Sequence, residues 1–200
     1  AARIGPTVTY SGGDNRTCTD TTGIISTLGT DEPCFDHTYD GANWNAQGLI
    51  IEEARSNLVL QSGDLGTTWA TAGGASVSTD QVVAPDGTTT ADLITKSGDV
   101  AGRVDQTISL AANTTYTYSV YFQDNNLASG AVTTLMVDDA DATDHHQQFT
   151  ISNGVPSLGG VSNVSDGFVI HVGGNWYRIG ASFTTGARSE ERRVGKECRS

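Results

Sequence analysis

The sequence has no long apolar run: nowhere do about 20 apolar residues follow one another, the length that a membrane-spanning helix needs. Basic residues are scarce as well, with 11 Lys and Arg against 23 Asp and Glu and a net charge of −12. Such a chain repels phosphate backbones and anionic lipid surfaces, which argues against nucleic-acid binding and membrane association. Residues 1–6 lack the apolar stretch of a signal peptide, so none is expected.

Charged residues and cysteines are also few. The charged fraction of 17% lies below the usual value of about 25%, which argues against coiled coils and long-helix bundles. Three cysteines in 200 residues do not make a disulfide-rich secreted scaffold. The chain is instead rich in Thr, Ser, Asn and Gly, and a chain of this length buries enough apolar surface to form one stable domain.

The pattern of the chain from Asn57 onward is that of an all-β domain. Short apolar runs of strand length recur between turns rich in Gly, Asn and Asp, as at residues 84–87. Residues 116–123 alternate most clearly: Tyr116, Tyr118, Val120 and Phe122 share one face. The sequence therefore predicts a β-sandwich of the jelly-roll type, preceded by an extended N-terminal arm.

We divide the chain into three parts by composition. Residues 1–47 are predicted to form the arm, with one or two short strands, and residues 48–187 the β-sandwich. Residues 188–200 differ sharply, because they hold five of the 11 basic residues, and they resemble the in-frame translation of a common DNA sequencing adapter. We interpret them as an artefact of metagenomic assembly and expect the natural protein to continue differently after Ala187.

Several motifs along residues 33–185 resemble a module of tailed-bacteriophage tail fibres and spikes. The most specific are Glu-Glu-Ala-Arg at 52–55 and Asn-Trp-Tyr-Arg at 175–178, and Phe-Asp-His at 35–37 accompanies them. The chain departs from the family at residues 62–65, where Ser-Gly-Asp-Leu stands in place of the usual Ser-Glu-Asp-Phe, so one acid and the aromatic are missing. The resemblance implies a lectin-like jelly roll, similar to carbohydrate-binding modules, carried on a virion fibre.

The same resemblance implies the surroundings of the protein. It would be part of the virion, assembled in the host cytoplasm, with other phage structural proteins and a host-surface glycan as partners, and it would form a homotrimer. Because the cytoplasm is reducing, we expect Cys18 and Cys34 to be free thiols, although the two could also bridge a loop of the arm.

No catalytic or cofactor motif stands out in the chain. Glu52 and Glu53 are neighbours, and neighbouring strand residues point to opposite faces, so they are not expected to act together on a glycosidic bond. His145 and His146 are expected in a solvated loop rather than at a metal. An acidic cluster offers the one weak signal for structural Ca²⁺, and its members are Asp138, Asp139, Asp141 and Asp144. We therefore predict a protein that is not an enzyme and has no cofactor, apart from the structural Ca²⁺ that this cluster leaves open.

Aromatic and polar residues on strands are the predicted ligand-binding groups. Sugars stack their apolar faces on aromatic rings, while polar side chains bind the hydroxyl groups. The predicted binding residues are Tyr121, Arg103, Trp176 and Arg178. Trp176 and Arg178 share one face of the last strand, Tyr177 and Ile179 the other, and the sequence leaves open which pair faces the core.

These observations favour a non-enzymatic, glycan-binding module of a fibre or spike. Two alternatives remain: an accessory carbohydrate-binding domain of a larger depolymerase, and a purely structural fibre spacer without an exposed aromatic surface.

Overall fold

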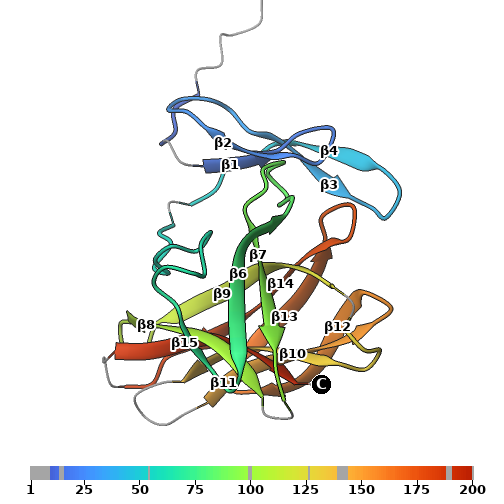
Figure 1. Ribbon diagram of the computed structural model, residues 1–200. Helices are drawn as coiled ribbons and strands as arrows, with labels where there is room; N and C mark the ends of the chain where they lie inside the picture. The colour runs from blue at the N-terminus through green and yellow to red at the C-terminus, as the bar shows by residue number, and fades with distance from the viewer. Residues whose placement is uncertain are drawn as a thin grey trace, which may run out of the picture. The chain divides into compact units, whose positions relative to one another are not determined.

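The computed structural model describes residues 10–13, 16–53, 55–98, 101–125, 127–138, 144–187 and 191–199, the last of these for the backbone alone. Every regular element in these ranges is a β-strand, and neighbouring strands pair antiparallel (Figure 1). The prediction of an all-β fold is confirmed. Among the same residues no helix is long and apolar enough to cross a membrane.

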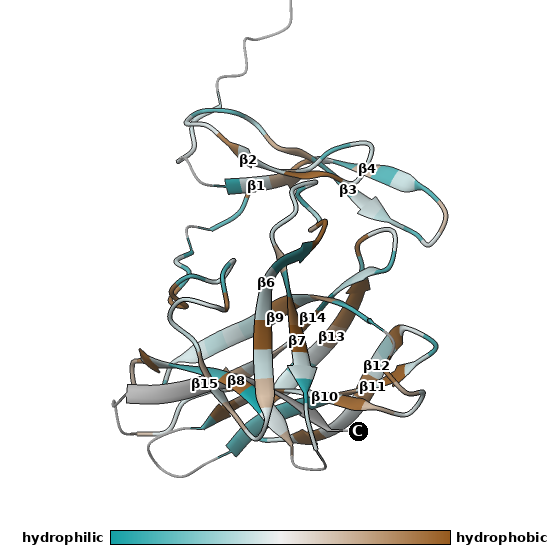
Figure 2. Cartoon of the chain, viewed as in Figure 1, coloured by the Kyte–Doolittle hydropathy of each residue, from teal (hydrophilic) through white to brown (hydrophobic). Residues whose placement is uncertain are grey.

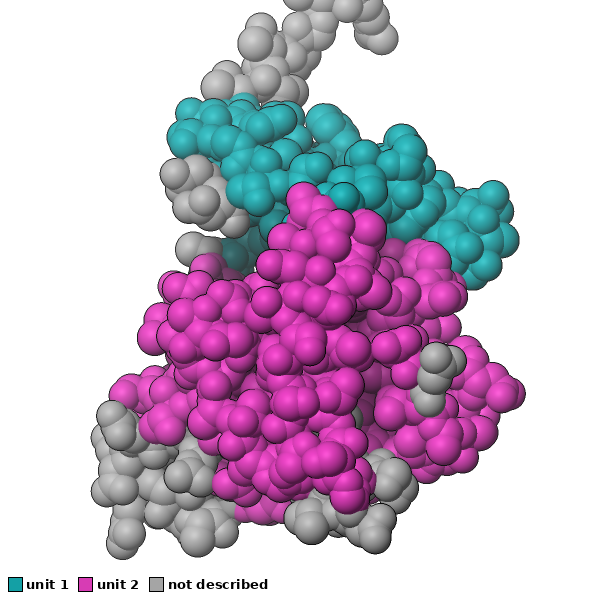
Figure 3. Space-filling model, in the orientation of Figure 1, with its two compact units in different colours: residues 1–54, 85–87 teal, residues 55–84, 88–200 magenta. Residues whose placement is uncertain are grey.

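The chain forms two compact units, coloured separately in Figure 3. Residues 1–54 and 85–87 make up unit 1, and residues 55–84 and 88–200 make up unit 2. The sequence placed a boundary after residue 47, whereas in the structure the last strand of unit 1 runs on through Gly48 and Leu49.

Unit 1 contains two β-hairpins, where the sequence suggested one or two short strands. Their four strands are β1 (Arg16–Thr19), β2 (Ile25–Leu28), β3 (Phe35–Tyr39) and β4 (Trp44–Leu49). Strands β3 and β4 are mostly white and teal in Figure 2, and their two large apolar side chains at the paired ends, Phe35 and Leu49, are 61% and 42% exposed rather than buried. The stability of this unit must therefore come largely from other sources.

Aspartates organise the turns of both hairpins. Asp20 Oδ1 accepts hydrogen bonds from the hydroxyl and amide of Thr22, both 2.7 Å long, and from the amide of Ile24. Asp40 accepts from the amides of Asn43 and Ala42 and from the Asn45 side chain. Donors of this kind stabilise a carboxylate, so the pKa of each aspartate lies below its ordinary value.

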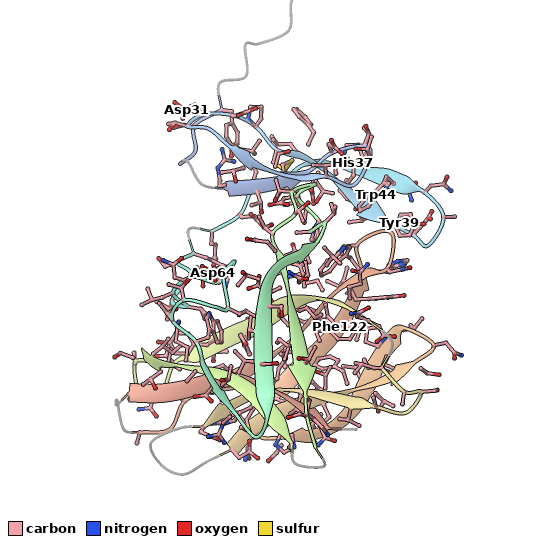
Figure 4. All side chains as sticks on the ribbon, in the orientation of Figure 1. Asp31, His37, Tyr39, Trp44, Asp64 and Phe122 are labelled. Atoms are coloured by element: carbon pink, nitrogen blue, oxygen red, sulfur yellow. A yellow bond between two sulfur atoms is a disulfide. The ribbon has the colours of Figure 1, made fainter. Side chains whose placement is uncertain are left out.

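A disulfide joins Cys18 on β1 to Cys34, which directly precedes β3, with their Cα atoms 5.6 Å apart. The expectation of two free thiols is therefore wrong. The two hairpins stack β1 beside β3, and this brings residues 16 positions apart within bridging distance. Trp44 also covers the turn at Gly23 and lies 5.2 Å from the ring of Tyr39 (Figure 4).

In the part of unit 2 that the structure describes there are eleven strands. They are β5 (Ala70–Ala72), β6 (Ala75–Val82), β7 (Ala91–Lys96), β8 (Gly102–Ser109), β9 (Thr115–Gln123), β10 (Val132–Asp138), β11 (Asp144–Ser152), β12 (Val155–Ser162), β13 (Ser165–His171), β14 (Trp176–Thr184) and β15 (Glu191–Arg199). A six-stranded sheet has the order β12-β11-β10-β15-β8-β5, a three-stranded sheet has the order β13-β14-β9, and β6 and β7 form a ribbon.

The core of unit 2 lies between the six-stranded and the three-stranded sheet. Phe122 and Ile179 come from the smaller sheet and pack with Leu135, Phe149 and Ile151 of the larger one. Strand β11 alternates buried and partly exposed residues along its length, as a sandwich strand should. Between β11 and β12 the turn is Asn153-Gly154, both with positive φ, which is the sequence that a two-residue hairpin turn favours.

The predicted alternation of residues 116–123 is present in β9. Tyr118, Val120 and Phe122 pack into the core, while Tyr121 and Thr117 on the other face are exposed. The environment of Tyr118 is apolar, and its burial raises the pKa of the phenol. Because β9 packs with one face and exposes the other, its outer residues are available for binding.

Strand β15 comes from the segment that we interpret as adapter-derived. Its backbone pairs with β10 on one side and β8 on the other, so it is an inner strand of the six-stranded sheet.

Candidate functional site

The outer face of the β13-β14-β9 sheet brings together three of the four predicted binding residues. Arg178 on β14 lies directly opposite Tyr121 on β9, and Trp176 lies opposite Gln123 one row away. Opposite residues of an antiparallel pair share one face, so these four side chains belong to one surface. This settles the open question about β14: Trp176 and Arg178 are on the outside, and Ile179 is buried in the core.

The row through Arg178 combines apolar and polar groups. Ile170 on β13 lies opposite Arg178 on the side away from Tyr121. The exposed fractions of Ile170 and Tyr121 are 47% and 40%, so both side chains are accessible to solvent. A phenol ring and an isoleucine thus flank a guanidinium group in a strip that spans all three strands.

The guanidinium group of Arg178 is held in place by its neighbours. Its Nε and Nη2 donate to Ser119 Oγ at 3.3 and 3.2 Å, and its Cζ lies 5.9 Å from the centre of the Phe168 ring. A cation over an aromatic face is attracted by the ring quadrupole. Arg178 still has N–H groups that these two contacts do not use, since a guanidinium carries five donors.

The Phe168 ring packs against β14 at residue 180, which is glycine. A Cβ atom on Gly180 would lie 2.5 Å from Phe168 Cζ and 2.7 Å from the backbone oxygen of Tyr118. Such contacts are too short for any side chain, so glycine is required for this packing. The arrangement adds a half-buried aromatic ring to the surface that carries Tyr121 and Arg178.

Trp176 closes one end of the surface. Its Nε1 donates to the backbone oxygen of Val83 at 3.1 Å, so the indole is fixed and half-buried. The turn before it, Gly173-Gly174-Asn175, has positive φ at both glycines. On the opposite, core-facing side of the same sheet, His171 stacks on Tyr177, with ring centres 4.7 Å apart.

Arg103, the fourth predicted binding residue, does not join this surface. It lies on β8 of the six-stranded sheet, and its Nε is 3.0 Å from Asp105 Oδ1. The pair is partly exposed, so it contributes at most about 1 kcal/mol to stability. We therefore assign Arg103 to the packing of the larger sheet and leave it out of the candidate site.

The histidine pair differs from the expectation of a solvated loop, because both residues are on β11. His145 is buried, its Nδ1 is 2.7 Å from the backbone oxygen of Asn163, and its ring is 5.3 Å from that of Phe183. His146 is on the other face, with its Nδ1 2.7 Å from Asp144 Oδ2. The two rings diverge, as neighbouring residues of a strand do.

The acidic cluster is only partly described. Asp138 and Asp144 form a cross-strand pair of β10 and β11, while Asp139 and Asp141 lie outside the described residues. Within the part of the chain that the structure describes, the one group with metal-ligand spacing is Cys18, Cys34 and Asp36. Its two sulfur atoms form the disulfide and are not thiolates, so this group does not suit a metal.

Besides Gln123, the sequence analysis did not select Phe168 and Ile170 for this surface. They stand two positions apart in the apolar run 167–172, so their shared face follows from alternation. A run that is apolar on both faces does not reveal which face is outside.

The comparisons with known proteins give no match, either to a family model or to a curated protein. The resemblance to phage fibre modules therefore remains a prediction, and any function must be argued from the surface itself.

Proposed function

We propose that unit 2 is a non-enzymatic carbohydrate-binding module of a phage fibre or spike, and that the outer face of β13-β14-β9 binds the sugar. The observation that carries the proposal is the exposed row of Ile170, Arg178 and Tyr121. A pyranose ring has an apolar C–H face and a rim of hydroxyl groups. The Tyr121 ring can stack on the apolar C–H face, and Arg178 and Gln123 can donate hydrogen bonds to the hydroxyl groups.

The shape of the surface suits an extended glycan rather than a small molecule in a pocket. The sheet is open, and a cavity of about 10 Å³ in the core beneath it, bordered by Tyr118 and Phe183, is too small for a monosaccharide. The net charge of −12 disfavours polyanionic sugars, so the preferred ligand is a neutral glycan. The host surface would supply it, with the fibre as a homotrimer in the virion.

A glycan array, read with and without Ca²⁺, tests this proposal on the full chain. Tyr121→Ala should weaken binding at least tenfold because it removes the stacking ring. Thr117→Ala is the matched control, since Thr117 is exposed on the same face of β9, about 13 Å along the strand. It should bind as the parent does, and circular dichroism should show both variants folded.

Two other outcomes decide against the proposal, and a third changes only its cofactor requirement. A folded protein that binds no glycan supports the structural spacer instead. Binding that Tyr121→Ala leaves unchanged places the site on another surface. Binding that requires Ca²⁺ points to the structural Ca²⁺ that the sequence leaves open.

A further inference from the structure

Strand β15 completes the six-stranded sheet of unit 2. It pairs antiparallel with β10 from Arg193 to Arg199 and with β8 from Glu191 to Cys198. Without it, β10 and β8 would be two unpaired edges about 10 Å apart, twice the spacing of neighbouring strands. We call the place between them the β8–β10 slot.

The register defines what each position of the slot requires. Position 196 is opposite Leu135 of β10 and Val104 of β8, which are both buried apolar residues. Position 194 is opposite Val137, which is also buried. In the backbone register, positions 194, 196 and 198 therefore stand opposite buried residues of both neighbouring strands.

The residues of β15 do not meet this requirement. Six of its nine residues are charged, and position 196, opposite Leu135 and Val104, is a lysine. At positions opposite a buried row, an inner strand of a sandwich normally carries apolar residues, and lysine is among the residues found there least often. The neighbouring strand β11 shows the usual pattern, with Phe149 and Ile151 buried at alternate positions.

We propose that the β8–β10 slot is a strand-acceptor site whose cognate occupant is an apolar C-terminal strand of this same protein, with residues 191–199 standing in its place. The cognate strand follows Ala187 in the uninterrupted gene and has apolar residues at positions 194, 196 and 198. Main-chain pairing, which any sequence without proline can provide, explains how the charged segment occupies the slot. The proposal concerns the larger sheet and does not depend on glycan binding.

A matched pair of substitutions in the full chain tests the requirement at position 196. Lys196→Val places an apolar residue between Leu135 and Val104, and we expect the folding equilibrium constant to rise about tenfold. Arg193→Val is the control, because position 193 is opposite Asp138 and Thr107, which are both exposed. Urea unfolding followed by circular dichroism measures both. Equal effects of the two substitutions, or no gain from Lys196→Val, would overturn the proposal.

Two further measurements test the source of the strand. The gain from Lys196→Val should be the same at every protein concentration, since the strand comes from the same chain. A gain that grows with concentration means that another copy donates it, which contradicts the proposal. Sequencing the gene beyond codon 187 from its source DNA should reveal alternating apolar codons in place of residues 188–200. If the gene encodes residues 188–200 as they stand, the proposal is wrong.

Discussion

The two units of this protein are stabilised in different ways. In the described part of unit 1, Cys34 is the one buried residue, and the hairpins are joined by its disulfide to Cys18 and by aspartate-centred turns. Unit 2 has an apolar core with one cluster around Phe149 and Ile151 and a second around Val137 and Phe183. A small β-structure that cannot bury enough apolar surface needs a cross-link, whereas a larger sandwich does not.

This difference has a consequence for where function can reside. The sandwich can leave one face of β9 and β14 exposed because the other face supplies its stability. The three predictions that follow separate the two modes of stabilisation, beginning with the largest effect. Hydrogen exchange followed by mass spectrometry distinguishes the units, because peptides from residues 16–49 and 102–184 report on each by itself.

The largest effect is expected from Phe149→Ala in unit 2. The side chain is 0% exposed, so its removal leaves a cavity and should lower the free energy of unfolding by about 3–5 kcal/mol. Phe35→Ala is the matched control in unit 1, where the ring is 61% exposed, and should change stability by less than about 0.5 kcal/mol. Urea unfolding of both variants measures the difference. Similar losses for the two would mean that unit 1 also depends on apolar packing.

An intermediate effect is expected from removing the disulfide with Cys18→Ala and Cys34→Ala together. The bridge closes a loop between residues 16 positions apart, so its loss should destabilise unit 1 by roughly 3 kcal/mol. Exchange in residues 16–49 should become faster, while residues 102–184 should keep their protection. Dithiothreitol should have the same effect on the parent and none on the variant. Faster exchange in both units would show that the bridge supports the sandwich as well.

The smallest effect is expected from acid, acting on the turn aspartate Asp40 of unit 1. Hydrogen bonds from Asn43, Ala42 and Asn45 hold the pKa of Asp40 below its ordinary value in the folded chain. The carboxylate therefore contributes stability above the ordinary pKa, and this contribution is lost as the pH falls through the folded pKa. Carboxyl carbon chemical shifts in an NMR titration should give a pKa for Asp40 below that of an unstructured aspartate. A value at or above it would contradict the turn geometry.

Alternation allowed the sandwich to be predicted from sequence, and long-range pairing limited the prediction elsewhere. The faces of β9 were assigned correctly because its aromatic and aliphatic residues, with the exception of Tyr121, stand at even positions. The disulfide was missed because the assumed reducing compartment outweighed the spacing of Cys18 and Cys34. Short strands between Gly and Asp turns, as in unit 1, carry too few residues for a period to be visible.

The candidate surface was partly predictable for the same reason. Tyr121 and Arg178 were selected by residue type and by the face of their strand, but their direct pairing depends on how β9 and β14 align. Arg103 was selected on residue type alone, and its sheet could not be known from local sequence. Strand β14 has an aromatic residue on each face, Trp176 and Tyr177, so alternation could not decide which one is outside.

Gly180 gives this surface an unusual sensitivity to sequence change. Any larger residue there must displace the Phe168 ring, which is also the ring beneath Arg178. Gly180 has no side chain that could contact a ligand, yet its small size determines how the Phe168 ring packs and therefore where Arg178 lies above it. Libraries that vary this surface should change Tyr121, Gln123 and Ile170 and keep Gly180, because the Phe168 ring beneath Arg178 then stays in place.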